Sequence, residues 1–284
     1  MTDHTAASTR QPARRLPFAG TLLAEQVRYQ LSLLLATPNA LVIGVGLPVI
    51  LLVAANVRHS GSAVSGLAGF AVFGMTLTAW NTHGIRLVAA RETGVLKRWR
   101  ASPLPRWCYL AGRIVTTALF ATAAGAVTVA AGVLFYHQHI TATGWLGVLI
   151  ALILGALAWA TAATATTGII PSVETANPVF VLVYFPVIII SGVLGTISAE
   201  PAWLSRLASY LPAQPVIDAM NRAVRHAPGA SFVSGRDVLV LVAWIAGTLM
   251  AALIVFRWEP SRPARRRPAR ADGRPARPKV SDSG

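Results

Sequence analysis

The sequence predicts an all-α integral membrane protein with six transmembrane helices, an N-terminal interfacial amphipathic helix and two short extracellular helices before the last span. Hydrophobic residues make up 54% of the chain and charged residues only 12%, whereas roughly 25% of residues are charged in an average soluble domain. Six apolar stretches approach or exceed the roughly 18 residues that a spanning helix needs. These predicted spans cover residues 40–57, 64–88, 110–136, 145–170, 178–194 and 238–256.

The basic residues set the predicted orientation, because short cytoplasmic segments retain Lys and Arg. Most of the 25 Lys and Arg residues lie before the first span, after the second span or beyond the last one. Both termini are therefore expected in the cytoplasm. The tails, residues 1–17 and 259–284, are rich in Pro and Arg without periodicity and are expected to be disordered, flanking one membrane domain over residues 18–258. The net charge of +15 suits an anionic leaflet rather than nucleic acid.

Residues 18–35 are expected to form a helix that lies in the membrane interface. Glu25, Arg28 and Ser32 share one narrow polar stripe at helical spacing, and the broad opposite side is apolar. Pro38 would break this helix before the first span. An N-terminal extension of the first span is the alternative. The apolar side consists of Leu22, Leu23, Val27, Leu31 and Leu34.

Residues 91–105 form a charged segment between two apolar spans, and prolines at positions 103 and 105 end it. If the segment is helical, Val95, Leu96 and Trp99 cluster on one side while Glu92 and its basic neighbours supply charge. A stiff, charged element with an apolar knob suits docking of a partner protein. A loop that only fixes membrane orientation is the alternative.

The spans themselves carry few polar groups. Pro178 is expected in the first turn of the fifth span, and Pro186 in its middle, where a kink could serve gating or only packing. Small residues are expected to permit close helix contact; they are Ala121, Gly125, Gly132, Gly155, Ala158 and Ala162. Other polar residues could line a translocation path or bond to their own helix; they are Asn81, His83, Thr161, Thr164, Thr166 and Thr167.

The long segment 197–236 is expected to hold two short amphipathic helices on, or dipping into, the outer leaflet. The first begins after Pro201, and the second follows Pro215 and carries Asp218 and Arg222 at a spacing of four. Ser234 is expected to begin the last helix in a capping box with Asp237.

No nucleotide or metal site is expected in this chain. The only lysines, Lys97 and Lys279, are not preceded by the glycine that a phosphate-binding loop requires. His137 and His139 are spaced poorly for metal binding, and a solvated loop is the simpler interpretation. A lipid-modifying enzyme would need a cluster of acids, bases or ligands, and the outer segment offers only Glu200, Asp218 and His226.

Two segments resemble those of the ABC-2 type permeases, the membrane subunits of ATP-binding-cassette exporters. Residues 91–105 are similar to the family pattern Glu-x-Gly-Thr-Leu followed by Leu-x-x-(Ser/Thr)-Pro, with Val95 in place of Thr and Trp99 in place of Leu. Residues 191–193 and 201–204 are similar to its late Ser-Gly-Val and Pro-x-Trp-Leu patterns. The resemblance covers residues 18–258 and is strongest to daunorubicin-resistance-like permeases of high-GC bacteria.

The resemblance implies export of a drug-like compound or lipid, as in multidrug efflux and antibiotic resistance, from a bacterial cell membrane. It implies a homodimer or a heterodimer with a similar permease, and a separate cytoplasmic ABC ATPase that binds ATP and Mg. A non-transporting scaffold or sensor subunit is the alternative. The ATPase-coupling residues would be Arg91, Glu92, Gly94, Leu96, Arg98 and Trp99, with Glu25 and Arg28 as a second contact.

Overall fold

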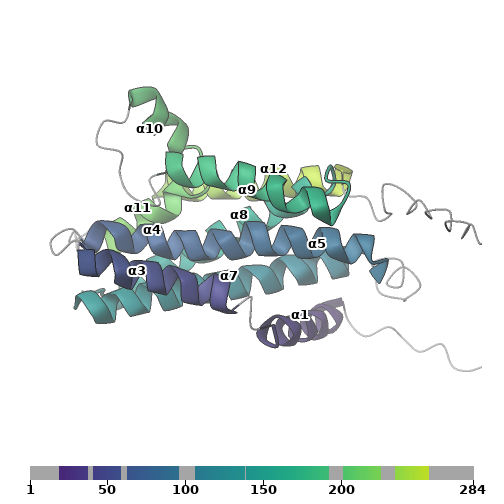
Figure 1. The fold of residues 1–284 in the computed structure, drawn as a ribbon, viewed down its shortest axis with the longest axis horizontal. Coiled ribbons are helices and arrows are strands. Elements are labelled where there is room, and N and C mark those ends of the chain that lie inside the picture. Colours follow the sequence, from purple (N-terminus) through teal and green to yellow (C-terminus); the bar gives the residue numbers. More distant parts are fainter. Residues whose placement is uncertain are drawn as a thin grey trace, which may run out of the picture.

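All regular elements in the described part of the chain are helices. The computed structural model describes residues 19–37, 41–58, 63–95, 106–137, 139–191, 201–224 and 234–255 (Figure 1). Both predicted tails lie outside these residues. The elements are α1 (Ala19–Leu35), η1 (Val42–Gly46), α3 (Leu47–Arg58), α4 (Ala63–Thr76), η2 (Leu77–Thr82), α5 (His83–Glu92), α7 (Arg106–Tyr136), α8 (Ala142–Thr167), α9 (Val173–Ile190), α10 (Ala202–Ala208), α11 (Gln214–Val224) and α12 (Gly235–Val255).

Within the described residues, four helices are long and apolar enough to cross a membrane. They are α7 from Trp107, α8, α9 and α12, and they coincide with the last four predicted spans. The first two predicted spans contain π-helical segments, η1 before α3 and η2 between α4 and α5. Where the structure describes the chain, it confirms helices without strands and apolar spans, while the count of six spans stays a prediction.

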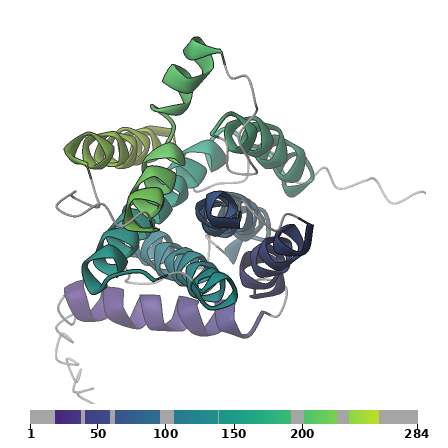
Figure 2. The ribbon, with the colours of Figure 1, turned by 90° about the vertical axis from the view of Figure 1, so that its left-hand side faces the viewer.

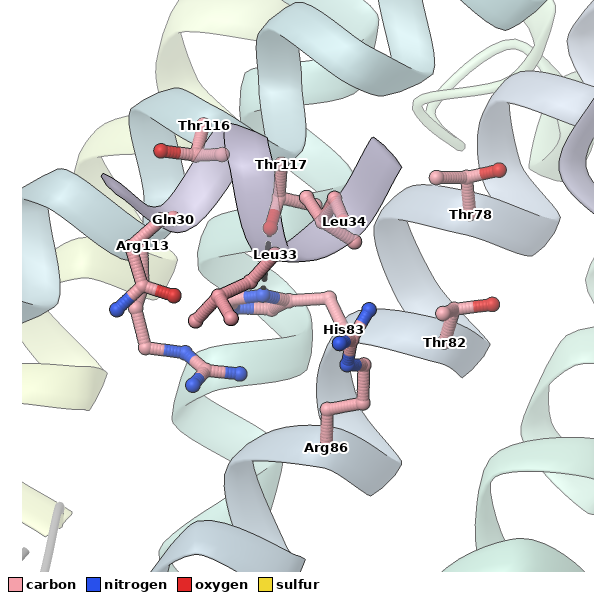
Figure 3. A pocket seen from close by; sticks show the side chains of 10 residues that line it. All are labelled: Gln30, Leu33, Leu34, Thr78, Thr82, His83, Arg86, Arg113, Thr116 and Thr117. Atoms are coloured by element: carbon pink, nitrogen blue, oxygen red, sulfur yellow. Dashed lines mark hydrogen bonds between the residues drawn. The ribbon is translucent and has the colours of Figure 1, made fainter. Parts of the chain in front are cut away.

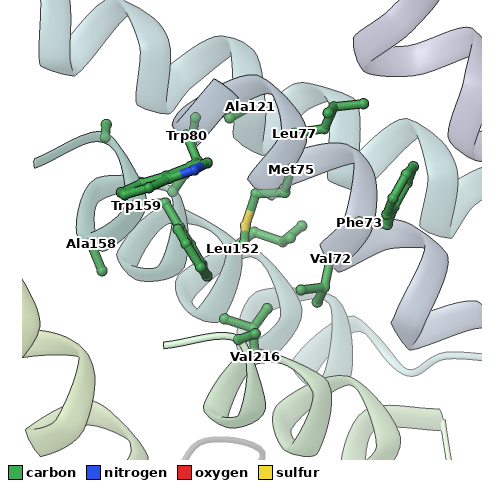
Figure 4. Packing of buried hydrophobic residues seen from close by; sticks show 14 of the residues in the cluster. Val72, Phe73, Met75, Leu77, Trp80, Ala121, Leu152, Ala158, Trp159 and Val216 are labelled. Atoms are coloured by element: carbon green, nitrogen blue, oxygen red, sulfur yellow. The ribbon is translucent and has the colours of Figure 1, made fainter. Parts of the chain in front are cut away.

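The central helix is α8: 67% of its 18-residue apolar stretch is buried, against 11% of the corresponding stretch in α12. It packs against α7, α11 and α12, and also contacts α5. Large side chains from neighbouring helices converge on it (Figure 4). The predicted role of the small residues in packing is confirmed: a Cβ on Gly125 would lie 2.7 Å from Leu152, and one on Gly132 would lie 2.1 Å from Leu67.

The helix α1 lies across the long helices rather than along them, as the view down the bundle shows (Figure 2). It packs on α7, where a Cβ on Gly112 would lie 2.6 Å from Gln26. Glu25 and Arg28 are exposed. This placement favours the interfacial helix over the alternative of an extension of the first span.

The structure corrects the prediction for α11. This helix does not lie on a surface: Val216, Ala219 and Met220 are buried, and α11 packs against α8 and α4. The positive charge of Arg222 favours the ionised form of Asp218, as the spacing of four predicts. Arg222 also pairs with Asp237 at the start of α12, and Gln214 Nε2 donates to Asp218 Oδ1 at 3.1 Å.

The start of α9 also differs from the prediction. The helix begins at Val173, five residues before Pro178, because Ser172 and Thr175 form a capping box and Glu174 places a carboxylate in the first turn. Pro178 and Pro186 both lie inside α9. The proposed gating kink at Pro186 stays a prediction.

Candidate functional site

The C-terminal end of α5 is tied to the connection between α8 and α9. Arg91, at the last turn of α5, is 2% exposed. Its Nη1 donates to the Thr167 carbonyl at 2.8 Å, and its Nη2 donates to the Ile170 carbonyl. The last carbonyls of a helix have no partner within the helix and carry partial negative charge. The guanidinium therefore satisfies the C-terminal end of α8.

The next residue does the converse for α9. Glu92 Oε2 accepts a hydrogen bond from the Val173 backbone N–H at 2.9 Å. The first N–H groups of a helix are also unpaired and carry partial positive charge, so a carboxylate stabilises this end. The pair Arg91 and Glu92, which we call the clamp, joins α5 to the end of one predicted span and the start of the next.

Gly94 explains how the chain leaves the clamp. Its φ of 74° lies in the left-handed region, which glycine adopts without penalty. The Thr93 N–H donates to the Ala89 carbonyl at 2.9 Å and the Gly94 N–H to the Arg91 carbonyl at 3.3 Å. These bonds end α5 in the manner of a C-terminal glycine cap.

The structure thus places three of the predicted coupling residues at one helix end. Arg91 is buried within the chain, while Glu92 is exposed, and its Oε1 accepts no hydrogen bond from the described residues. The other three, Leu96, Arg98 and Trp99, lie outside the described residues. The sequence analysis did not predict that Arg91 and Glu92 bind elements of their own chain. Residues 166–174 contain the end of one helix and the start of the next, and charged side chains stabilise such helix ends.

A polar pocket lies between α1, η2, α5 and α7 (Figure 3). Its volume is about 100 Å³. The positively charged side chains at its rim are Arg86 and Arg113, with His83 between the two helices that carry them. The remaining lining residues are Gln30, Leu33, Leu34, Thr78, Thr82, Thr116 and Thr117.

His83, in the wall of this pocket, joins three helices. Its Nδ1 lies 2.8 Å from Thr117 Oγ1 and its Nε2 lies 3.0 Å from Thr164 Oγ1. The Thr164 hydroxyl donates to the Ala160 carbonyl at 2.8 Å, so its oxygen accepts from Nε2–H, and Nδ1 accepts from Thr117. His83 thus holds α5, α7 and α8 in register.

The threonines of α8 bond to their own helix. The hydroxyls of Thr161, Thr166 and Thr167 donate to carbonyls three or four residues earlier, at 2.6 to 3.0 Å. This geometry is the low-cost way to place a hydroxyl in an apolar helix. It supports the simpler of the two interpretations of these residues.

These features define the class of protein: a helical, multi-pass membrane protein whose charged clamp ties a polar segment to two apolar helices. The profile of the ABC-2 family transporter proteins matches residues 41–255, which is most of the chain. The chain belongs to this family. A comparison with curated proteins finds no significant match.

Proposed function

We propose that this chain is the membrane permease of an ABC exporter that moves a hydrophobic or amphiphilic molecule, drug-like or lipid, outward. Family membership supports a membrane component that works with an ABC ATPase in general. In the proposal, a separate ATPase docks on the cytoplasmic side at residues 91–105, with Glu25 and Arg28 as a second contact. Two permease chains, identical or similar, form the path in a bacterial cell membrane with all termini cytoplasmic.

The observation that carries the proposal is the clamp. A rigid link is needed if movement of a docked segment is to reach the spans. Arg91 and Glu92 connect the start of the predicted docking segment to the ends of α8 and α9. A displacement of this segment on ATP binding would therefore move the fourth and fifth predicted spans directly.

The distribution of acidic residues supports the choice of an ATPase over an ion gradient. Ion-coupled transporters usually carry carboxylates within the membrane. In the described residues, the acids lie on α1, at helix ends or on α11. They are Glu25, Glu92, Glu174, Asp218 and Asp237.

The test is co-expression with an ATPase encoded beside this chain's gene, purification by a tag on the permease, and ATP-dependent uptake of a fluorescent amphiphile by inverted vesicles. Co-purification with uptake supports the exporter. Co-purification without uptake of any amphiphile tried favours the scaffold or sensor, and failure of any ABC ATPase to co-purify contradicts the proposal.

A further inference from the structure

The pocket beside α1 contains two arginines without an acidic partner. Arg86 and Arg113 are close enough for their positive charges to repel one another. No acidic side chain is among the described residues that line the pocket. Bringing two like charges together in a partly desolvated site is unfavourable unless an anion lies between them.

The hydrogen bonds of the two guanidinium groups leave donors unused. Arg86 Nη2 donates to Thr37 Oγ1 at a long 3.5 Å, while its Nη1 is buried and has no partner in the described structure. Arg113 Nη1 donates to Tyr109 Oη at 3.2 Å. Both are neutral partners that position the groups without neutralising them. A guanidinium presents five N–H donors, so each arginine has more donors than the described residues accept.

Other polar groups in and near the pocket are also unsatisfied. Thr78, which lines the pocket, has a buried Oγ1 without a partner among the described residues, and Gln26 Nε2 is in the same condition outside the lining, one helical turn from Gln30 on α1. Buried polar groups in folded proteins are nearly always hydrogen-bonded, so such a cluster indicates a missing ligand or water. The volume of about 100 Å³ is several times the roughly 10–15 Å³ that one water needs.

We propose that this pocket binds a phosphate group, and that its source is an anionic phospholipid of the leaflet in which α1 lies. Arginine suits a phosphate because its planar N–H groups bond two oxygens at once. Leu33 and Leu34 supply an apolar wall on α1 beside the two cations, which fits an amphiphile with its phosphate inward and its chains along the leucines. The proposal does not depend on the export function.

The test is a binding titration on the purified full chain in neutral detergent. Dioctanoyl phosphatidylglycerol is compared with dioctanoylglycerol, which has the same chains without the phosphate, and with inorganic phosphate. The test variant is the double substitution Arg86→Gln/Arg113→Gln. The control is Arg206→Gln, which makes the same substitution at one exposed site on α10. We expect saturable binding of phosphatidylglycerol by wild type and control, and at least about tenfold weaker binding by the double variant.

Inorganic phosphate distinguishes the source. If it displaces phosphatidylglycerol at similar concentrations, the site takes a free oxyanion and the phosphate chemistry is upheld; if it does not, the lipid is the ligand. Equal affinity of wild type and double variant for phosphatidylglycerol, or equal binding of dioctanoylglycerol, overturns the proposal.

Protein stability provides a second test. Because the arginines repel one another without an anion, Arg86→Gln should leave the melting temperature in lipid-free detergent unchanged or raise it. Arg86→Lys should keep part of the phosphatidylglycerol binding, since the positive charge remains but the planar pair of N–H donors is lost. A large fall in melting temperature for Arg86→Gln, independent of added phosphatidylglycerol, would mean that the arginine is structural and would also overturn the proposal.

Discussion

At the residue scale, Arg91 and Glu92 show how two neighbouring charges serve opposite helix ends. Arg91 binds carbonyls at the end of α8, and Glu92 binds the first N–H of α9. Each interaction places a charge where the helix dipole favours it. Exchanging the two residues would place each charge at the wrong helix end, so their order in the sequence is part of the structure.

Gly94→Ala should destabilise the end of α5. The φ of 74° places any other residue in the left-handed region, at a cost of roughly 1 kcal/mol. No atom of the described residues lies within 4 Å of the added Cβ, so the variant tests the backbone conformation. We expect a lower melting temperature in detergent. Gly20→Ala, where the added Cβ also meets nothing, is the control, and equal behaviour of the two variants would contradict the account.

Asp218 predicts a pH-dependent stability. Burial disfavours its charged form and raises the pKa of the carboxyl above its ordinary value, partly offset by the Gln214 hydrogen bond. A raised pKa in the folded state means that this group's contribution is fully present below the unfolded-state pKa and is lost as pH rises through the folded-state pKa.

Asp218→Asn should therefore become more stable relative to wild type as pH rises through that range. Asparagine stays neutral and can still accept from Gln214 Nε2. Thermal unfolding of both proteins in detergent, measured at a series of pH values, checks this. A stability difference that is independent of pH would show that Asp218 titrates normally in the fold.

At the element scale, the contact between α5 and α9 decides whether the clamp can be rigid. Gly84 lies against Phe180, which is fully buried and has its ring centroid 5.1 Å from that of Trp80. The Trp80 Nε1 also donates to the Phe180 carbonyl at 2.9 Å. Because this contact lies about two turns from the clamp, it holds α5 and α9 together along their length.

Gly84→Ala should separate these two helices. The added Cβ would lie 2.1 Å from the Phe180 ring, and the ring cannot move freely because Trp80 packs on it. Overpacking of this kind costs roughly 1–3 kcal/mol. We expect a clear loss of thermal stability, recovered in part by Phe180→Leu. The control is Gly247→Ala on α12, where the added Cβ meets no atom of the described residues. This variant should be neutral or slightly stabilising.

The elements were more predictable from sequence than their contacts. Apolar length and proline positions predicted α1, α7, α8 and α12 within a few residues, because these signals are local. The burial of α11 was missed since an amphipathic helix has the same pattern on a lipid surface as against α8. The sequence shows Arg86 and Arg113 within predicted spans, but their convergence on one pocket without an acidic side chain depends on how α5 and α7 pack.

At the scale of the whole molecule, the structure arranges the features of the two proposals at one end. The clamp, α1 and the polar pocket beside α1 lie toward the same end of the bundle, and α10 lies at the other (Figure 1). The sequence assigns the first end to the cytoplasm from its basic residues. This sidedness stays a prediction.

Cysteine labelling tests the sidedness. In a Cys108→Ser background, which removes the buried native thiol, Ser205→Cys on the exposed face of α10 should react with a membrane-impermeant maleimide in right-side-out vesicles. Glu25→Cys on α1 should react only after permeabilisation. The reverse pattern would invert the topology and remove α1 from the cytoplasmic side.

The central claim is that Glu92 transmits the action of a partner ATPase through α9. The most direct measurement is ATP turnover, with and without transported amphiphile, in the purified complex carrying Glu92→Ala, which removes the acceptor for the Val173 N–H. Glu174→Ala is the control, because it removes the same charge from an exposed position in the first turn of α9. The account predicts that Glu92→Ala still binds the ATPase but loses most of the stimulation by substrate, while Glu174→Ala keeps it. Full stimulation in Glu92→Ala, at unchanged complex yield, would contradict the account.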